Sequence, residues 1–288
     1  MATPEGIVSI QSWVAYGHVG NAAAVFPLQC LGFDVWPVHT VQFSNHTGYG
    51  VWRGQVMTVD HIRDVVEGIG ERGALAGCRA VLSGYLGAPE LGEAVLDAVR
   101  AVRGLRSDAL YACDPVMGDD GRGFFVREGI PAFFAEKAVP AADIMTPNRF
   151  ELEHLTGLPV TDVPSALAAT AALRARGPRI VAVTSLPVAG DDGQLAVLAD
   201  CAEGAWHVRT PRLPVNLNGT GDAFTALLLG HYLQTGRVDR ALGAAVATLF
   251  GVIEATAQAG VRELRLVASQ DGIRHPEARF PVEPVRRA

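Results

Sequence analysis

Cysteine is scarce in this sequence, which has only four residues of this type and no CxxC pair. Their irregular spacing also lacks the regular combination with histidine that zinc sites need. Free cysteine commonly acts as a small core hydrophobe, so we expect buried or half-buried thiols in a reducing compartment, with a reactive thiol as the less favoured alternative. The four residues are Cys30, Cys78, Cys113 and Cys201.

An excess of positive charge is missing as well. The formal net charge is -6 at pH 7, and the pI is near 5.7. Proteins that bind nucleic acids usually carry a basic face that neutralises phosphates, so the composition favours a small-molecule partner. Net charge does not describe the distribution of charge within one site, and a local basic pocket stays open.

Long apolar runs are absent too. Residues 1–10 contain neither the basic segment nor the apolar core of a signal peptide. The longest weakly apolar stretch, residues 241–253, is rich in alanine and shorter than the roughly 20 residues needed to span a bilayer. We therefore expect this stretch to form a buried helix, and we expect a cytoplasmic protein with no membrane partner.

The sequence does contain a persistent alternation of short apolar runs with longer helical patterns. This alternation is typical of βαβ units and predicts an α/β fold with a mostly parallel sheet covered on both faces. With 288 residues, 49% of them hydrophobic, the chain can bury a sizeable core, and nothing requires two domains. The predicted strands are residues 7–10, 35–39, 80–83, 110–113, 144–146 and 180–184. The predicted helices are residues 21–31, 59–69, 89–102, 164–176, 222–233 and 240–258.

Polar, glycine-rich segments interrupt this rhythm after several strands. They are residues 44–54, 118–123 and 216–221. Ligands of open α/β sheets bind outside the carboxyl ends of the strands, so we expect the functional site in these segments. Residues 195–198 and 205–209 are expected to pair as a hairpin, because the second run alternates apolar and polar residues. The tail after about residue 280 is expected to be irregular.

The strongest local signal is Gly219-Thr220-Gly221-Asp222, which precedes an apolar helical pattern. A glycine-flanked turn that opens a helix presents free backbone N–H groups, which can hold a developing phosphate charge. Asp222 would then be placed to take a proton from a substrate hydroxyl as that hydroxyl attacks phosphorus. An ordinary helix cap by Asp222 is the alternative, and these four residues alone do not decide between the two.

Two more acidic motifs follow predicted strands. The sequence DPVMGD at residues 114–119 suits cation binding beside a triphosphate, because magnesium prefers a few carboxylates with water and phosphate oxygens; a structural turn is the alternative. In TPNRFE at residues 146–151, Asn148 and Glu151 would face one side of a first helical turn. They could hold metal-bound water there, or they could form a helix capping box.

The three motifs support one another, because independent helix caps have no reason to converge on phosphoryl transfer. In this chain order they resemble the ribokinase-like superfamily. The amino-terminal half narrows the resemblance, since Ser9-Ile10-Gln11-Ser12, VQFSNHTGY at residues 41–49 and Leu82-Ser83-Gly84-Tyr85 look like the corresponding segments of the pyridoxal kinase family. The resemblance extends from Ile7 to about Gly260.

The resemblance implies a single ribokinase-like three-layer domain over residues 1–288. It also implies ATP-dependent phosphorylation of the 5'-hydroxymethyl group of pyridoxal, with Asp222 as the catalytic base. The amides of Gly219, Thr220 and Gly221 would stabilise the transferring phosphoryl group. Magnesium is implied together with ATP, potassium is favoured as a monovalent cation, and a homodimer is expected.

The resemblance also assigns residues to the two substrates. Ser12 and Thr47 are expected to contact the pyridine substrate, where hydroxyls can serve a ring nitrogen and a phenolic oxygen as donor or acceptor. The other expected substrate contacts are Val19, His46, Gly48, Tyr85 and Asp222, although packing alone explains Tyr85 equally well. The expected ATP contacts are Asp114, Asp119, Thr146, Glu151, Thr184, Ser185, Thr210, Pro211, Arg212 and Leu213.

We also expect cation sites and a closing segment beside the nucleotide. Glu151 and Asp119 are expected to hold magnesium, through water, and the implied monovalent-cation site consists of Asp114, Thr146 and Thr184. Residues 118–129 are glycine-rich and charged, and we expect them to order over ATP and exclude water.

Three positions depart from the family pattern. Trp13 follows Ser12 where histidine is common, Arg149 replaces a common glutamine, and Asn218 precedes the GTGD motif. Trp13 could enlarge an apolar wall, change the preference among pyridoxal, pyridoxine and pyridoxamine, or pack outward.

Other functions stay open at this point. A hydroxymethylpyrimidine kinase would keep the GTGD motif, but Ser12 and Thr47 argue against it. A catalytically silent protein that binds B6 vitamers is disfavoured by the intact acids Asp119, Glu151 and Asp222. A sugar kinase is disfavoured because the NHTGY and IQS segments have no clear role in binding a sugar.

Overall fold

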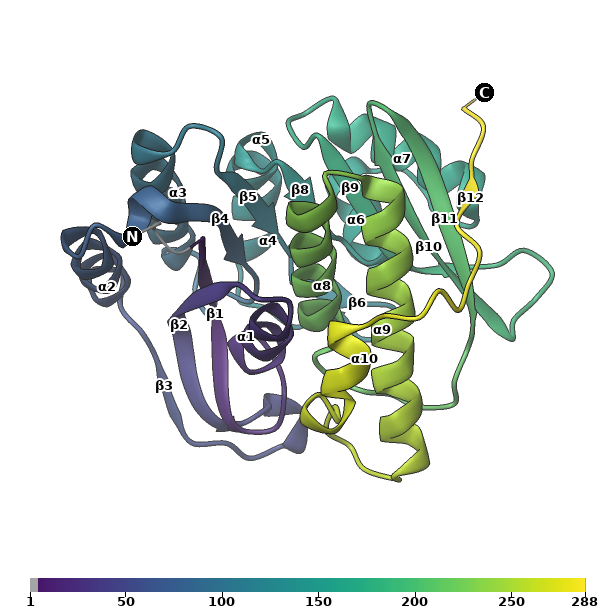
Figure 1. Cartoon of the computed structure of the whole chain (residues 1–288), viewed down its shortest axis with the longest axis horizontal. Coiled ribbons are helices and arrows are strands. Elements are labelled where there is room, and N and C mark those ends of the chain that lie inside the picture. The colour runs from purple at the N-terminus through teal and green to yellow at the C-terminus, as the bar shows by residue number, and fades with distance from the viewer. Residues whose placement is uncertain (1–4, 288) are drawn as a thin grey trace.

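The computed structural model describes residues 5–287, and its centre is one ten-stranded sheet (Figure 1). The strand order is β12-β11-β10-β9-β8-β5-β4-β1-β2-β3. The neighbouring strands from β9 to β2 are parallel, and antiparallel strands lie at both edges. The parallel strands are β1 (Gly6–Tyr16), β2 (Asp34–Asn45), β4 (Cys78–Ser83), β5 (Leu110–Cys113), β8 (Ile144–Met145) and β9 (Ile180–Pro187). The antiparallel strands are β3 (Gly54–Val56), β10 (Gln194–Cys201), β11 (Gly204–Pro211) and β12 (Glu283–Pro284).

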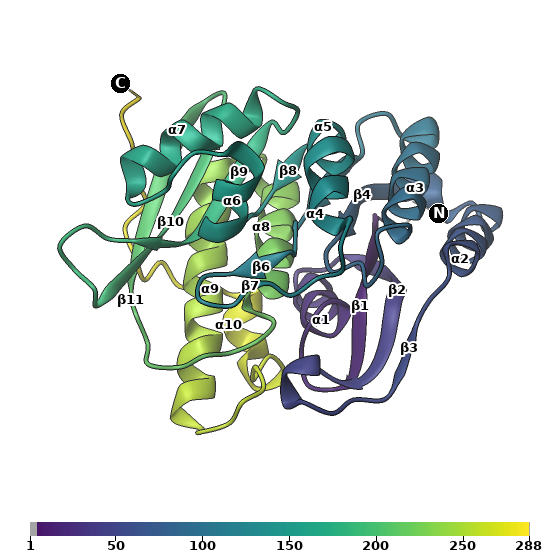
Figure 2. The ribbon, with the colours of Figure 1, turned by 180° about the vertical axis from the view of Figure 1, so that it is seen from behind.

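Helices cover both faces of the sheet, which confirms the predicted three-layer α/β fold. One face carries α1 (Asn21–Cys30), α8 (Thr220–Thr235), α9 (Val238–Gln258) and α10 (Gln270–Arg274), seen in front in Figure 1. The opposite face, seen in front in Figure 2, carries α2 (Val59–Glu71), α3 (Leu91–Leu105), α6 (Arg149–Thr156) and α7 (Val163–Arg174). A helical segment on this second face consists of α4 (Ile130–Phe133), a π-helical turn (Phe134–Ala138) and α5 (Val139–Ala141). Short 3-10 turns are η1 (Thr47–Tyr49), η2 (Ala74–Gly77) and η4 (Val267–Ser269).

Each face of the sheet contributes to a separate apolar core. In β4, Val81 packs into the core beneath α2 and α3, whereas Ala80 and Leu82 pack into the core beneath α1 and α8. Because both faces are covered, the central strands contain short continuous apolar runs, such as Leu110–Cys113 in β5 and residues 180–183 in β9. This pattern is why short apolar runs predicted these strands correctly.

Helix α9 contains the alanine-rich stretch that we expected to form a buried helix. By length and hydropathy α9 could cross a membrane, and half of its most apolar window is buried within the protein. It packs along α8 and against β10 and β11. These contacts are those of a core helix of the α/β domain.

Several predicted loops contain short regular elements. Strand β2 extends to Asn45, which pairs with Tyr16 of β1, and residues 41–43 also pair with β3. The expected loop at residues 44–54 is therefore partly strand and 3-10 turn. Residues 118–123 lie within a small hairpin of β6 (Gly118–Asp119) and β7 (Gly123–Phe124). The hairpin of β10 and β11 forms as predicted. The tail, expected to be irregular, contributes β12 to the sheet, where His207 Nε2 lies 2.9 Å from Glu283 Oε2.

Candidate active site

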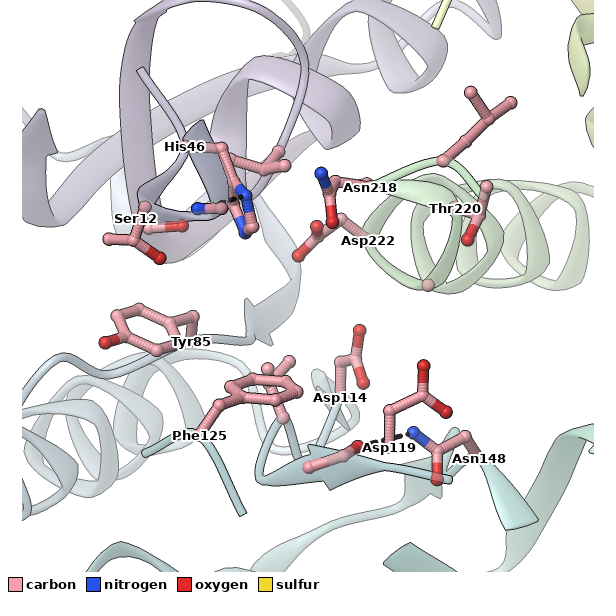
Figure 3. Close-up of a pocket in the computed structure, with 18 of the residues that line it drawn as sticks. Ser12, His46, Tyr85, Asp114, Asp119, Phe125, Asn148, Asn218, Thr220 and Asp222 are labelled. Atoms are coloured by element: carbon pink, nitrogen blue, oxygen red, sulfur yellow. Dashed lines mark hydrogen bonds between the residues drawn. The ribbon is translucent and has the colours of Figure 1, made fainter. Parts of the chain in front are cut away.

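A cavity of about 400 Å³ lies at the carboxyl ends of the parallel strands, beside the start of α8. Figure 3 shows Ser12, His46 and Tyr85 at one end of the cavity, Asp119 and Asn148 at the other, and Asp222 between them. The lining includes every expected contact of the pyridine substrate: Ser12, Val19, His46, Thr47, Gly48, Tyr85 and Asp222. It also includes Gly219, Thr220, Gly221, Asp114, Asp119, Thr146, Glu151, Thr184 and Ser185. The fold therefore brings together residues from all the motifs.

The start of α8 forms the centre of the cavity wall. Helix α8 begins at Thr220, and Gly219 before it has a φ of +84°. A Cβ atom on Gly219 would lie 1.9 Å from the carbonyl oxygen of His18, so both the backbone conformation and the close approach require glycine. No side chain in residues 5–287 caps this helix, and its first N–H groups remain available to an anion. Asp222, the third residue of the helix, does not act as its cap.

Three carboxylates converge in the cavity without a basic partner. Asp114 and Glu151 are 4% and 3% exposed, and Asp222 is partly buried. Burial raises the pKa of all three, that of Glu151 to about 8, and the charges of Glu151 and Asp222 raise the pKa of Asp114 further. The ion pairs found among residues 5–287 involve other acids. Buried acids that repel one another in this way fit a bound cation.

The protein supplies too few ligands to enclose a metal ion by itself. No group of three or more His, Cys, Asp or Glu side chains in the described part of the chain is arranged to hold one. Magnesium usually keeps several waters and binds through one or two carboxylates together with phosphate oxygens. The exposed carboxylate of Asp119 and the buried one of Glu151 are consistent with that mode of binding.

Glu151 also has a clear structural role. Its Oε2 accepts the N–H of Asn148 at 2.9 Å, while Asn148 Oδ1 accepts the N–H of Glu151 at 2.9 Å, which completes a capping box. Its Oε1 accepts the N–H of Met117 at 2.9 Å. The capping alternative raised from the sequence is therefore present, and Glu151 joins the start of α6 to the loop after β5. The N–H of Gly118 also bonds this carboxylate, which leaves one of its four lone-pair sites for water.

A β-bulge places Ser185 at the edge of the cavity. In the pairing of β9 with β10, Thr184 and Ser185 together oppose the single residue Val197. Ser185 has a φ of +61° and is the one non-glycine residue in the described chain with a positive φ. Such strained residues cluster at functional sites. The bulge turns Thr184 and Ser185 into the cavity at the point where β9 lies beside Asn148.

Hydroxyl groups connect the buried acids of the cavity to α8. Thr146 Oγ1 lies 2.7 Å from Thr225 Oγ1, which in turn donates to the carbonyl of Gly221 at 3.0 Å. The side chain of Thr225 also interacts with Asp114, and this interaction lowers the pKa of the acid against the larger effect of burial. The orientation of Asp114 is therefore linked to the first turn of α8.

At the other end of the cavity, loop geometry fixes the expected pyridine contacts. His46 Nδ1 accepts the N–H of Gly48 at 3.0 Å, and burial is the main cause that lowers the pKa of His46. Ser12 is buried against Gly20, where a Cβ atom would lie 2.2 Å from the Ser12 hydroxyl oxygen. The neutral imidazole and the buried hydroxyl form a wall suited to an uncharged aromatic ring.

Four of the expected nucleotide contacts do not line the cavity. Thr210 and Pro211 end β11, and Arg212 and Leu213 follow it. The N–H of Arg212 donates to the carbonyl of Gly193 at 2.7 Å, which closes the β10–β11 hairpin region. Contact of these four residues with the nucleotide stays a prediction.

Comparisons with known proteins give a consistent result. A sequence model of the pfkB family of carbohydrate kinases matches residues 131–255, which include the TPNRFE and GTGD motifs. A protein of Rubrobacter xylanophilus named pyridoxal kinase PdxY is 55% identical over 281 residues, covering 97% of each chain. One of the same name from Deinococcus radiodurans is 52% identical over 289 residues, covering 98% of this chain and 97% of its own. The chain belongs to the pyridoxal kinase family.

Solved structures of pyridoxal kinases have the same fold. The enzyme of Leishmania donovani in complex with ADP and ginkgotoxin superposes with a TM-score of 0.92 at 34% identity, covering 98% of this chain and 100% of its own. The complex of the same enzyme with ADP and pyridoxamine gives a TM-score of 0.91. The pyridoxal kinase of Entamoeba histolytica, at 24% identity and a TM-score of 0.90, supports the fold alone.

The departures from the pyridoxal kinase pattern have distinct structural settings. Trp13 does not line the cavity; its ring lies 5.0 Å from that of His39, on the opposite side of the strand from Ser12. Arg149 pairs with Asp120 through contacts of 2.9 and 2.7 Å, and so ties the start of α6 to the β6–β7 hairpin. Of the three, only Asn218 lines this cavity.

The sequence analysis missed several other lining residues of the cavity. Some lie inside the quoted motifs, and their side chains could have been assigned by position. The missed residues are Val14, Val41, Phe43, Val116, Gly118, Arg122, Phe125 and Leu217. Arg122 and Phe125 come from the segment expected to cover the nucleotide, and they had no local signal beyond that segment's glycine content.

Proposed function

We propose that this protein transfers the γ-phosphoryl group of ATP to the 5'-hydroxymethyl group of pyridoxal, with Asp222 as the general base. The observation that carries this proposal is the position of Asp222, which stands between the pyridine end and the nucleotide end of one cavity, on the first turn of α8. A hydroxymethyl group and a terminal phosphate that enter from the two ends meet beside this carboxylate. Membership in the pyridoxal kinase family supports the same reaction.

The proposed reaction step is an in-line displacement at phosphorus. As the substrate oxygen bonds to the γ-phosphorus, its proton passes to Asp222, and the bond from phosphorus to the bridging oxygen breaks to release ADP. The raised pKa of Asp222 makes it a better proton acceptor than an exposed aspartate. The N–H groups at the start of α8 hold negative charge on the transferring group.

Cations complete the proposal. Asp119 and Glu151 would hold magnesium through water, and Asp114, Thr146 and Thr184 would hold a monovalent cation such as potassium. When bound, magnesium neutralises charge on the phosphates. Support comes from the buried acids, whose mutual repulsion a cation would relieve. Residues 118–129, including the β6–β7 hairpin, would close over the nucleotide.

Two further expectations stay proposals. A homodimer rests on the family resemblance, and sedimentation of the purified protein would test it. A cytoplasmic location rests on the sequence alone, and fractionation of cells that produce the protein would test it.

The decisive experiment measures ADP release by purified protein with magnesium and potassium, comparing pyridoxal, pyridoxine, pyridoxamine and hydroxymethylpyrimidine. Turnover of pyridoxal with formation of its 5'-phosphate is expected. A preference for hydroxymethylpyrimidine would identify the protein as a hydroxymethylpyrimidine kinase. Tight binding of pyridoxal without ADP release would instead identify a silent B6-binding protein.

A further inference from the structure

The segment between α9 and α10 carries no recognised motif, yet it reaches the pyridine end of the cavity. Leu264 and Leu266 are 1% and 0% exposed and anchor the segment in the core beneath α8. In Figure 1 the segment crosses from the foot of α9 to the loops at the ends of β1 and β2. Glu263 is therefore held at a fixed place beside those loops.

The carboxylate of Glu263 joins two loops that are far from it in sequence. Its Oε2 accepts the backbone N–H of His18 at 2.9 Å, and its Oε1 accepts the hydroxyl of Tyr49 at 2.7 Å. His18 belongs to the loop from β1 to α1, and Tyr49 ends the 3-10 turn after β2. Each oxygen of one side chain thus holds one loop.

Both loops carry the expected pyridine contacts immediately beside these bonds. Val19 follows His18, and Thr47 and Gly48 precede Tyr49. All three line the cavity, whereas Glu263 does not. Any shift of the two bonded groups moves these lining residues directly, because they are separated from them by one or two residues.

Neighbouring residues are arranged around the Glu263 carboxylate. Gly17 has a φ of +97°, and a Cβ atom there would lie 2.2 Å from Glu263 Oε2, so glycine leaves the space that the carboxylate occupies. The Arg262 guanidinium stacks 4.4 Å from the centroid of the Tyr49 ring. The hydrogen bond to Glu263 is the main cause that raises the pKa of Tyr49 to about 12, so Tyr49 stays a donor across the working pH range.

We propose that Glu263 is a positioning residue that holds the 17–20 and 46–50 loops in the geometry that binds the pyridine ring. It sets the affinity for the vitamer without touching the ring or the reacting atoms. The inference rests on the proposed function and adds to it the residue that holds the loops at the pyridine end of the cavity. The nucleotide end has no contact with Glu263, so its affinity for ATP is independent of this residue.

Three variants separate positioning from a general structural role. Glu263→Met keeps the length of the side chain and removes both hydrogen bonds. Glu263→Gln keeps both, because its amide oxygen can accept from His18 and its NH₂ group can donate to the oxygen of Tyr49. Tyr49→Phe removes one bond and leaves Glu263 in place. Glu254→Gln is the matched control, since Glu254 pairs with Arg279 at 2.9 Å on the outside of α9.

For Glu263→Met we expect the KM for pyridoxal to rise about 10- to 100-fold, which corresponds to losing one or two charge-assisted hydrogen bonds. The KM for ATP and kcat should stay near the wild-type values. Glu263→Gln should restore most of the affinity for pyridoxal. Tyr49→Phe should raise the same KM, and it should add nothing in the Glu263→Met background.

A pyridoxal KM within threefold of the wild type in Glu263→Met would overturn the inference, and so would an equal rise in both KM values. If Glu263→Met does not fold, an unchanged pyridoxal KM in Tyr49→Phe overturns it in the same way. These outcomes leave the proposed function intact, because wild-type turnover is measured separately. A wild-type protein that does not phosphorylate pyridoxal would overturn both.

Discussion

Replacing Asp222 by asparagine tests the proposed base while preserving the shape of the site. Asparagine has nearly the same size as aspartate but cannot accept the substrate proton. The positive φ of Gly219 and the free N–H groups of α8 belong to the backbone and should persist. The variant therefore removes one chemical role and keeps the anion-binding turn.

The expected loss in kcat is about 10²- to 10⁴-fold, the usual contribution of a positioned general base. The KM values for both substrates should change little, because Asp222 is one of many lining residues. Stability should not fall. Burial raises the pKa of Asp222 in the folded protein above its usual 3.8, so this acid disfavours folding increasingly as the pH rises above 3.8. Asparagine removes this cost along with the repulsion of Asp114.

Steady-state ADP release and thermal unfolding without ligands, both at pH 8, measure the two effects. Asp239→Asn is the matched control, because Asp239 also lies in the first turn of a helix, in this case paired with Arg237 at 2.7 Å. The control should keep full activity. A kcat for Asp222→Asn within tenfold of the wild type would refute the assignment of the base. A melting temperature that falls together with activity would show that the loss comes from misfolding.

Two more predictions concern the same cavity. Without ligands or divalent cations, the unfolding free energy should fall as the pH rises from about 4.5 to about 8, because folded Glu151 keeps a proton that the unfolded chain has released. Glu151→Gln should flatten this part of the pH profile, and an unchanged slope would exclude Glu151 as its source. Gly219→Ala should lower kcat at least tenfold and destabilise the fold by about 1–3 kcal/mol, since its Cβ would lie 1.9 Å from a backbone oxygen. Gly236→Ala, with a φ of +65° and open space around it, should cost only about 1 kcal/mol and leave kcat unchanged, and equal effects of the two variants on kcat would contradict the steric argument.

Much of the fold could be predicted because the sheet is covered on both faces. Burial makes the central parallel strands short apolar runs, and helices such as α2 and α3 keep an apolar stripe that faces the core. The site followed from the same logic, since motifs that leave the carboxyl ends of parallel strands must meet at one edge. The GTGD turn was the strongest local signal, and its first glycine, Gly219, is required by its positive φ and by the close approach of the His18 carbonyl.

Features that depend on distant pairing could not be predicted. The extension of β2 depends on its pairing with β1 and β3, and the bulge at Ser185 depends on the register between β9 and β10. Nothing local to Ser185 indicates a positive φ, because serine normally avoids it. Glu263 lies 245 residues from His18, so no spacing rule connects them. The side of β1 on which Trp13 packs likewise follows from its contact with His39.

The buried acids Asp114 and Glu151 are held in position by neutral groups rather than by basic side chains. Neutral groups orient the carboxylates: the side chain of Thr225 interacts with Asp114, and the N–H groups of Met117 and Asn148 bond Glu151. These contacts fix positions without cancelling the negative charge, since no basic side chain in the described chain pairs with either acid. Because the geometry is set before a ligand binds, little reorganisation is required when a cation and a polyphosphate enter. Burial is the main cause that raises the pKa of Asp114 and Glu151, and repulsion by neighbouring acids adds to it. A bound cation would relieve this repulsion, so the melting temperature should rise when the ligands bind.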